Sequence, residues 1–129
     1  MFVFIRYWKC LFAWGMSKFL RLMAIGDSVD KVHHKLMGDR PHWYLAIVGV
    51  DPDRQGQGLG TKILRPVLEQ ADREQREAYL ECSNPVNIPF YEKLGFEIRE
   101  TRPCSDWNKE SPVLYYMIRP PQTPSSSKQ

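Results

Sequence analysis

The sequence predicts an α/β domain with a mixed sheet, and three observations lead to this prediction. Short apolar runs of strand length alternate with stretches of helical period, in the order β-α-β-α-β-β, which is typical of α/β folds. The composition, 43% apolar and 26% charged, is that of a globular domain. The length of 129 residues suits one domain with a modest core.

The N-terminal stretch "MFVFIRYWKCLFAWGMSKFLRLMAIG" is apolar and basic. Four charges (Arg6, Lys9, Lys18 and Arg21) interrupt it, so no uncharged run approaches the ~20 residues of a membrane span. No signal-peptide cleavage site follows it. We expect a long helix over residues 5–25 that packs on the core, with a basic membrane-surface helix as the alternative.

The domain organisation follows from composition along the chain. Residues 1–118 are expected to form one domain, with a helical segment at 1–40 and a core at 42–118. The end of the chain, "RPPQTPSSSKQ" at 119–129, is rich in Pro and Ser and has no apolar period, which predicts a disordered tail.

The first half of the core should contain one strand and one helix. Residues 26–41 are expected to be a short helix or a turn-rich connection. The run "HWYLAIVGV" at 42–50 indicates a buried strand, with a bulge or close backbone approach at Gly49. From Leu59 to about Glu77 the pattern is helical, with Pro66 predicting a kink or an irregular first turn. One apolar face is expected to carry Ile63, Leu64, Val67, Leu68 and Ala71.

The second half should contain three strands and one short helix. Strands are expected at "EAYLEC" (77–82), "FEIRET" (96–101) and "SPVLYYMIR" (111–119). The segment "SNPVNIPFYEKLG" (83–95) predicts a turn and a short helix, because Pro89 suits a first helical turn and Gly95 a helix end.

Charge and cysteine content exclude several classes. A net charge of +3 is too small to indicate nucleic acid, although it mildly favours an anionic ligand. The three cysteines are odd in number and share no CxxC spacing. We therefore expect no disulfide framework and no metal site, and the reducing cytoplasm as the compartment.

The stretch "QGQGLG" at residues 55–60 carries the main functional signal. It fails the dinucleotide pattern G-x-G-x-x-G at Thr61, and it fails the P-loop pattern because Lys62 follows Thr61 rather than Gly. It fits Q/R-x-x-G-x-G/A. Glycines allow positive φ and leave room, so that backbone N–H groups at a helix N-terminus can hold a pyrophosphate. A glycine turn with no ligand is the alternative.

Residues 42–100 resemble the GCN5-related N-acetyltransferase (GNAT) family. The resemblance rests on the strand ending "VGVDP", the loop "QGQGLG" that opens a helix, and "NIPFYEKLGF". It looks nearest to the branch that contains puromycin N-acetyltransferase. It implies a GNAT fold, which is a mixed, mostly antiparallel sheet flanked by helices.

The resemblance also implies a cosubstrate and a site. The cosubstrate is acetyl-CoA, from which an acetyl group passes to a primary amine, of a small molecule, in a ternary complex. The pantetheine arm would pair with the strand end, and a backbone N–H there would polarise the acetyl carbonyl. The family's pattern carries the cofactor-binding role to Val48, Val50, Gln55, Gly56, Gln57, Gly58, Leu59, Gly60 and Thr61.

Catalytic roles are carried over in the same way. Tyr91 corresponds to the family's general acid, which protonates the thiolate of CoA; a phenol of pKa about 10 is protonated at neutral pH. Glu81 is the candidate general base, with His42 as the alternative. Asn84 and Asn87 are candidates for the pantetheine amides, or for capping the helix of Pro89. Cys82 is expected to be a core residue.

The chain departs from the family at its N-terminus. Only residues 1–41 precede "HWYLAIVGV", so the family's first strands are expected to be missing and the fold to be truncated there. The strand would then expose an edge that invites a homodimer. A non-catalytic acyl-CoA-binding remnant or interaction module is therefore the alternative to an enzyme. No nucleic-acid partner and no stable membrane span are expected.

Overall fold

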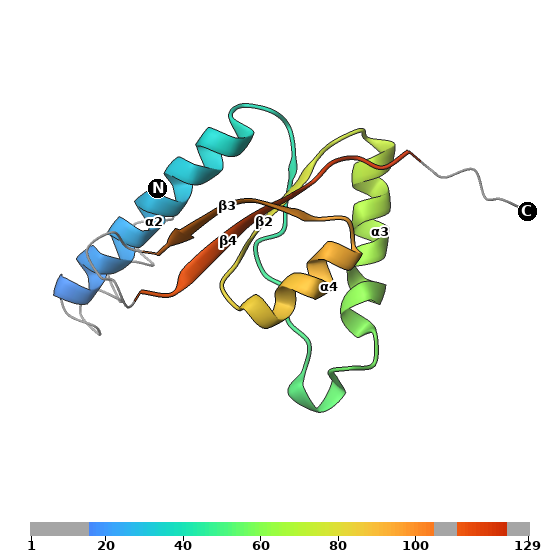
Figure 1. Cartoon of the computed structure of the whole chain (residues 1–129), viewed down its shortest axis with the longest axis horizontal. Coiled ribbons are helices and arrows are strands. Elements are labelled where there is room, and N and C mark those ends of the chain that lie inside the picture. Colours follow the sequence, from blue (N-terminus) through green and yellow to red (C-terminus); the bar gives the residue numbers. More distant parts are fainter. Residues whose placement is uncertain (1–15, 105–110, 124–129) are drawn as a thin grey trace, which may run out of the picture. The chain divides into compact units, whose positions relative to one another are not determined.

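The computed structural model describes residues 16–104 and 111–123, with side chains from residue 25 onward. The chain divides into two compact units. One comprises residues 1–38 and 103–111, and the other residues 39–102 and 112–129. The elements are labelled in Figure 1. The candidate site lies within the second unit, which is therefore described in more detail.

The first unit contains one long helix, α2 (Met16–Met37). The expected turn or short helix at 26–41 is wrong, because α2 runs through Gly26 without a break. An interior glycine costs only about 1 kcal/mol relative to alanine, and an ion pair between Lys31 Nζ and Asp27 Oδ2 (2.6 Å) supports the same turn. The helix ends where Gly38 takes a φ of 57° and its N–H donates to the carbonyl of His34.

The N-terminal expectations lie partly beyond the described residues. The helix expected at 5–25 begins outside them and enters them at Met16. Among the described residues, no helix is both long enough and apolar enough to cross a membrane.

The second unit is built on a four-stranded mixed sheet, as the sequence predicts, and the strands lie in the order β1-β2-β4-β3. The strands are β1 (Trp43–Tyr44), β2 (Ala78–Cys82), β3 (Glu97–Pro103) and β4 (Val113–Arg119). β1 runs parallel to β2, and β2 runs antiparallel to β4 from the pair Ala78–Arg119 to the pair Cys82–Tyr115.

The strand expected at 42–50 is much shorter than predicted. Its last backbone hydrogen bond with β2 runs from the Leu45 N–H to the Tyr79 carbonyl (2.9 Å). Residues 45–50 have no regular structure, and the Ile47 side chain is 93% exposed. β1 lies at the edge of the sheet with a strand on one side only, so little holds the continuation in the sheet. The separation from β2 thus begins before Gly49, where a bulge was expected.

Helix α3 (Leu59–Arg73) follows the glycine loop and packs on the sheet. Leu64, Leu68 and Ala71 are buried, as expected for the apolar face. Ile63 was expected on the same face, but its side chain is 57% exposed. Pro66 lies inside the helix without ending it. The helix ends at Arg73, earlier than expected, because Gln75 takes a φ of 54°.

The core lies between α3, helix α4 (Ile88–Lys93) and one face of the sheet, as can be followed in Figure 1. Side chains alternate along β2, so Leu80 and Cys82 face this core and Tyr79 and Glu81 face the opposite side. Its buried members are Leu64, Leu68, Ala78, Leu80, Cys82, Phe96 and Met117. Cys82 is a core residue, as the sequence predicts.

The first residues of the expected disordered tail are held by the fold instead. Arg119 is the last residue of β4 and is buried, and the Gln122 N–H donates to Asp72 Oδ1 (2.8 Å). Residues 124–129 lie outside the described residues.

Candidate functional site

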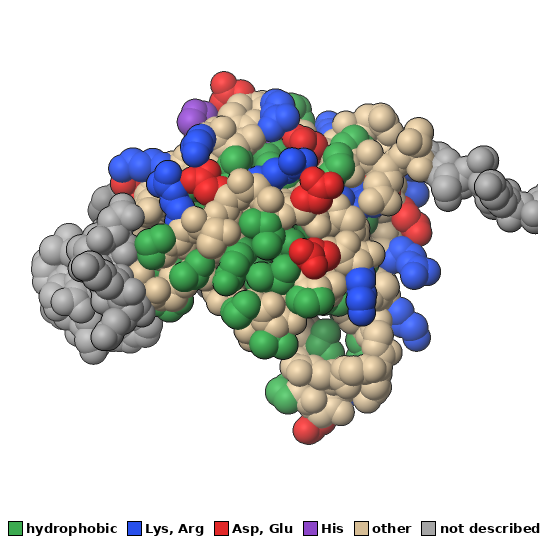
Figure 2. Space-filling model, viewed as in Figure 1, with side chains coloured by type: hydrophobic (Ala, Val, Ile, Leu, Met, Phe, Trp, Pro, Cys, Tyr) green, Lys and Arg blue, Asp and Glu red, His purple; other side chains and the backbone are tan. Residues whose placement is uncertain are grey.

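A cavity of about 630 Å³ opens where residues 48–50, the glycine loop, the first turn of α3 and helix α4 meet. The loop projects from the second unit below α3 and α4, and the space-filling view shows a hollow between the loop and the helices (Figures 1 and 2). The cavity is lined by Val48, Gly49, Val50, Arg54, Gln55, Gly56, Gly58, Leu59, Gly60, Thr61, Asn87, Phe90, Tyr91 and Lys93.

The loop is shaped by its own short-range hydrogen bonds. Asp51 caps a single 3₁₀ turn, η1 (Pro52–Arg54), by accepting from the Asp53 N–H (3.0 Å). Gln55 then bridges back: its Nε2 donates to the carbonyl of Val50 (3.2 Å). The Gln55 side chain therefore closes the loop and leaves the ligand side of the cavity to backbone groups.

The glycines make the next turn possible. Gly56 and Gly58 have φ values of 75° and 72°, which non-glycine residues rarely adopt. Gly58 is the N-cap of α3 and has no side chain to cap it. The first N–H groups of a helix have no partner within the helix, and the first residues of α3, Leu59, Gly60 and Thr61, line the cavity. The partial positive charge at such a helix end is suited to a negatively charged group.

The opposite wall is α4, a helix of only six residues. Its approach is fixed by Asn84, whose Oδ1 accepts from the Val86 N–H (3.1 Å) and so caps the 3₁₀ turn η2 (Pro85–Asn87). Phe90 lies directly against the first turn of α3, because a Cβ on Gly60 would come within 3.0 Å of its ring. Gly60 thus permits the two walls to meet.

Tyr91 is held between aromatic neighbours on this wall. Its ring meets those of Phe90 (5.1 Å between centroids) and Phe96 (5.9 Å) edge to face. Burial raises the pKa of the Tyr91 phenol above its ordinary value, and the neighbouring Cys82 adds to this. The phenol is therefore protonated throughout the neutral range, as a proton donor must be.

Most of the residues predicted for the site line this one cavity, and three do not. Gln57 and Asn84 are not among its lining residues, and neither is Glu81. Three lining residues were missed by sequence reasoning: Arg54, Phe90 and Lys93. Arg54 directly precedes "QGQGLG", and Phe90 and Lys93 lie within "NIPFYEKLGF". Their place in the sequence could have suggested them, but whether their side chains face the cavity depends on the fold. They add two cationic groups to the anion-binding side.

Glu81 lies on the other face of β2, in a different environment. Its Oε2 accepts from the hydroxyl of Tyr44 (2.7 Å), and its buried Oε1 has no hydrogen-bond partner among the described residues. Tyr79 lies beside it, and burial raises the pKa of its phenol strongly, with the Glu81 carboxylate contributing next. The rings of His42 and Tyr79 meet edge to face, with 6.2 Å between their centroids. Tyr44 was not singled out by the sequence; its register opposite Tyr79 brings it here.

The arrangement combines an anion-binding helix end, a protonated phenol on one side of β2 and a carboxylate on the other. The chain matches the acetyltransferase (GNAT) family over residues 19–96, more than half of its length. It belongs to that family. The sequence-based identification of the family and of its fold is therefore confirmed.

Relatives of this GNAT chain include proteins that are named as acetyltransferases. It is 37% identical over 91 residues to an uncharacterized N-acetyltransferase of Schizosaccharomyces pombe, covering 70% of this chain and 36% of the relative. It is 47% identical over 85 residues to a mycothiol acetyltransferase of Saccharomonospora viridis, covering 60% of this chain and 28% of the relative.

A solved structure gives the same picture of the fold. The chain is similar to Arabidopsis thaliana Naa50 in complex with the bisubstrate analogue CoA-Ac-MVNAL, with 32% identity and a TM-score of 0.52. The match covers 59% of this chain and 52% of that one. The chain spans about a third of the curated relatives above and about half of this structure.

Proposed function

We propose that the chain is an acetyl-CoA-dependent N-acetyltransferase that acetylates a primary amine. The observation that carries the proposal is the uncapped N-terminus of α3, which opens into the same cavity as Tyr91. The N–H groups of Leu59, Gly60 and Thr61 would hold the pyrophosphate of CoA, with Arg54 and Lys93 supplying positive charge around it. Val48–Val50 would pair with the pantetheine arm, and Asn87 would reach its amides.

The proposed chemistry is direct transfer. The amine nitrogen attacks the thioester carbonyl carbon, the carbon–sulfur bond breaks, and the sulfur leaves as a thiolate. Tyr91 donates its proton to that thiolate. Before the attack, Glu81 takes a proton from the acceptor ammonium, directly or through water, from the opposite side of β2. The second proton, which the nitrogen loses as the amide forms, restores the Tyr91 phenol. The position of Glu81 two residues after Tyr79, the last β2 residue to hydrogen-bond the backbone of residues 43–45, supports this division, since acid and base then approach the gap between the strands from two faces.

We propose a small molecule as the acceptor, although the relatives divide on this point. The 47% identity to a mycothiol acetyltransferase favours a small molecule, whereas the likeness to Naa50 favours a peptide N-terminus. Around Glu81, the rings of Tyr44 and Tyr79 lie 5.6 Å apart. A carboxylate beside aromatic rings suits a protonated amine with an apolar neighbour.

A second candidate is binding of acyl-CoA without turnover. The observation that favours it is the loss of strand structure after Tyr44, because residues 48–50 are those expected to pair with the pantetheine arm and polarise the acetyl carbonyl. Such a chain would bind acetyl-CoA with the same loop but would not accelerate thiol release.

We also propose that two copies associate through the β1 edge, where Ile47 is 93% exposed. Edge strands pair readily with other chains. Sedimentation should give a concentration-dependent dimer that Ile47→Lys abolishes; a monomer at every concentration would contradict this. We propose the cytoplasm as the location, since a reducing compartment suits the free thiols of Cys82 and Cys104.

Thiol release from acetyl-CoA tests the enzyme directly. Three acceptors separate the amine classes: phenethylamine, spermidine and a peptide with a free N-terminus. We expect turnover with at least one of them, and a loss of about 10²–10⁴-fold in kcat for Tyr91→Phe. Because the Tyr91 pKa is raised, the acid should fail only above about pH 10. Acetyl-CoA binding without turnover by the unaltered chain would favour the second candidate.

A further inference from the structure

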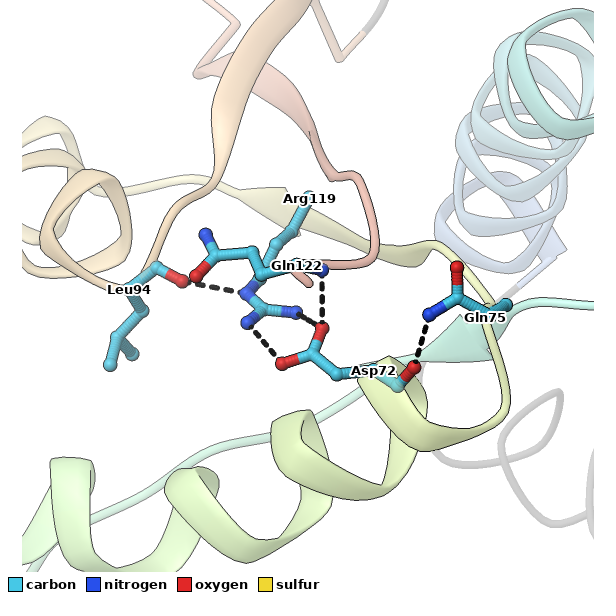
Figure 3. Close-up of polar contacts among 5 residues, drawn as sticks. All are labelled: Asp72, Gln75, Leu94, Arg119 and Gln122. Atoms are coloured by element: carbon cyan, nitrogen blue, oxygen red, sulfur yellow. Dashed lines mark hydrogen bonds and ion pairs between the residues drawn. The ribbon is translucent and has the colours of Figure 1, made fainter. Parts of the chain in front are cut away.

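A buried arginine connects the two walls of the cavity at their far ends (Figure 3). Arg119 is 4% exposed, and its guanidinium donates to both carboxylate oxygens of Asp72, at 2.6 and 2.8 Å. Its Nε donates to the carbonyl of Leu94 at 2.8 Å. Asp72 lies in the last turn of α3, and Leu94 is the C-cap of α4. We call these three residues the Arg119 clamp.

The α4 wall cannot hold its own position. A helix of six residues is far below the length that is stable alone in water. Apart from its apolar contacts with the core, the side-chain hydrogen bond at its C-terminal end comes from Arg119. The Leu94 N–H in turn donates to the carbonyl of Tyr91 (3.0 Å), so one hydrogen bond joins the clamp to the backbone of the proposed acid.

The α3 wall is fixed by the same guanidinium. The helix is about 22 Å long at about 1.5 Å per residue, so holding its C-terminal end also directs the N-terminal end that carries the glycine loop. Asp72 is further held by the Gln122 N–H at Oδ1, and the Gln75 Nε2 donates to its backbone carbonyl (2.8 Å). The Arg119 hydrogen bond lowers the pKa of the Asp72 carboxyl, so the pair is charged at neutral pH.

The turn between α4 and β3 is sterically restricted at Gly95, next to the Arg119 clamp. Gly95 has a φ of 92°, and a Cβ there would collide with the Gln122 side chain and approach the Arg119 Nε at 3.4 Å. The clamp and this turn thus form one packed corner.

We propose that Arg119 is a positioning residue: through Leu94 and Asp72 it sets the Tyr91 hydroxyl relative to the anion-binding end of α3. This rests on the proposed function, since the residue positioned is the proposed acid. A lysine at 119 keeps the charge but has no fork, so it cannot serve both Asp72 and Leu94.

A double-mutant cycle on CoA affinity tests the proposal without an acceptor amine. CoA is titrated calorimetrically into the unaltered chain, Arg119→Lys, Tyr91→Phe and the double variant. Tyr91→Phe should weaken binding about fivefold, as for loss of one hydrogen bond. Arg119→Lys should weaken it about tenfold, and the double variant should also stand at about tenfold rather than fiftyfold. Arg73→Lys is the matched control, because Arg73 is exposed and its side chain contacts Gln70; it should bind as the unaltered chain does.

Two results would overturn the proposal. Affinities that multiply in the double variant would mean that Arg119 acts independently of Tyr91, as a purely structural residue would. Unchanged affinity in a folded Arg119→Lys chain would remove the role altogether. If Arg119→Lys does not fold, Asp72→Asn takes its place in the same cycle, with the same non-additivity expected. Absence of CoA binding by the unaltered chain would instead refute the proposed function itself.

Discussion

The two ends of α3 are treated in opposite ways. At the N-terminal end the cap is a glycine, the preceding residues 51–58 are exposed, and backbone N–H groups face a cavity. At the C-terminal end the Asp72 carboxylate accepts three hydrogen bonds, two from a buried arginine and one from the Gln122 N–H. One end is left open to a ligand, and the other is closed by the protein's own groups. The comparison suggests that precision at the open end depends on the closed one.

The closed end should account for much of the stability. Arg119→Ala leaves the Asp72 carboxylate without its counter-ion and the Leu94 carbonyl without its donor. Removing one partner of a buried pair typically costs about 3–5 kcal/mol, so the free energy of unfolding should fall by about that amount. Urea denaturation followed by circular dichroism measures it.

Arg73→Ala provides the control for that experiment. Arg73 is one residue away on α3 but is exposed, and it should change stability by less than about 0.5 kcal/mol. Equal losses in the two variants would contradict the special role of the closed end.

Acid should weaken the closed end selectively. The pKa of Asp72 is lowered in the folded chain, chiefly by its hydrogen bond with Arg119. The unfolded state therefore takes up the proton first, at about pH 3.9, and stability falls as the pH drops from there toward the folded pKa. Above that window the contribution is complete. Asp72→Asn should be less stable at pH 7 and should lack this part of the acid loss, and parallel slopes in both chains between pH 5 and pH 2 would contradict the assignment.

The smallest expected effect concerns the open end. Gly60→Ala would bring a Cβ within 3.0 Å of the Phe90 ring, so Phe90 must move by a few tenths of an ångström. Because alanine also favours the helix by about 1 kcal/mol, stability should change little while acetyl-CoA affinity falls severalfold. Thermal melts and calorimetry separate the two, and lower stability with unchanged affinity would show that this contact is structural only.

The open end could be predicted from the sequence because its signals are local. The glycine spacing, the "NIPFYEKLGF" motif and the family resemblance each lie within one short stretch, and their residues line one cavity. The capping alternative was wrong in its target: Asn84 caps the 3₁₀ turn η2, not the helix of Pro89, and Asn87 at the N-cap of α4 makes no side-chain cap hydrogen bond. Arg54, Phe90 and Lys93 were missed, because their direction depends on how α4 packs on α3.

The closed end could not be predicted, because it joins residues that are far apart in the sequence. Asp72 and Arg119 are 47 positions apart, and Arg119 stood at the start of an expected disordered tail. The predicted length of β1 was wrong for a similar reason. Its apolar run has strand propensity, but a strand also needs a neighbouring strand to pair with, and propensity does not show whether one is present. The prediction for α2 was wrong because the expected helix ended just before Gly26. The helix continues through this glycine, whose cost inside a helix is small.

The central claim is that the open end of α3 is an acetyl-CoA site. Calorimetric titration of acetyl-CoA into the chain, Gly58→Asp and Gly38→Asp tests it most directly. Both glycines have positive φ, 72° and 57°, so the backbone strain is similar, but only Gly58 lines the cavity. The account predicts micromolar binding by the unaltered chain and by Gly38→Asp, and none by Gly58→Asp. Equal binding by all three chains, or no binding by a folded unaltered chain, would contradict it.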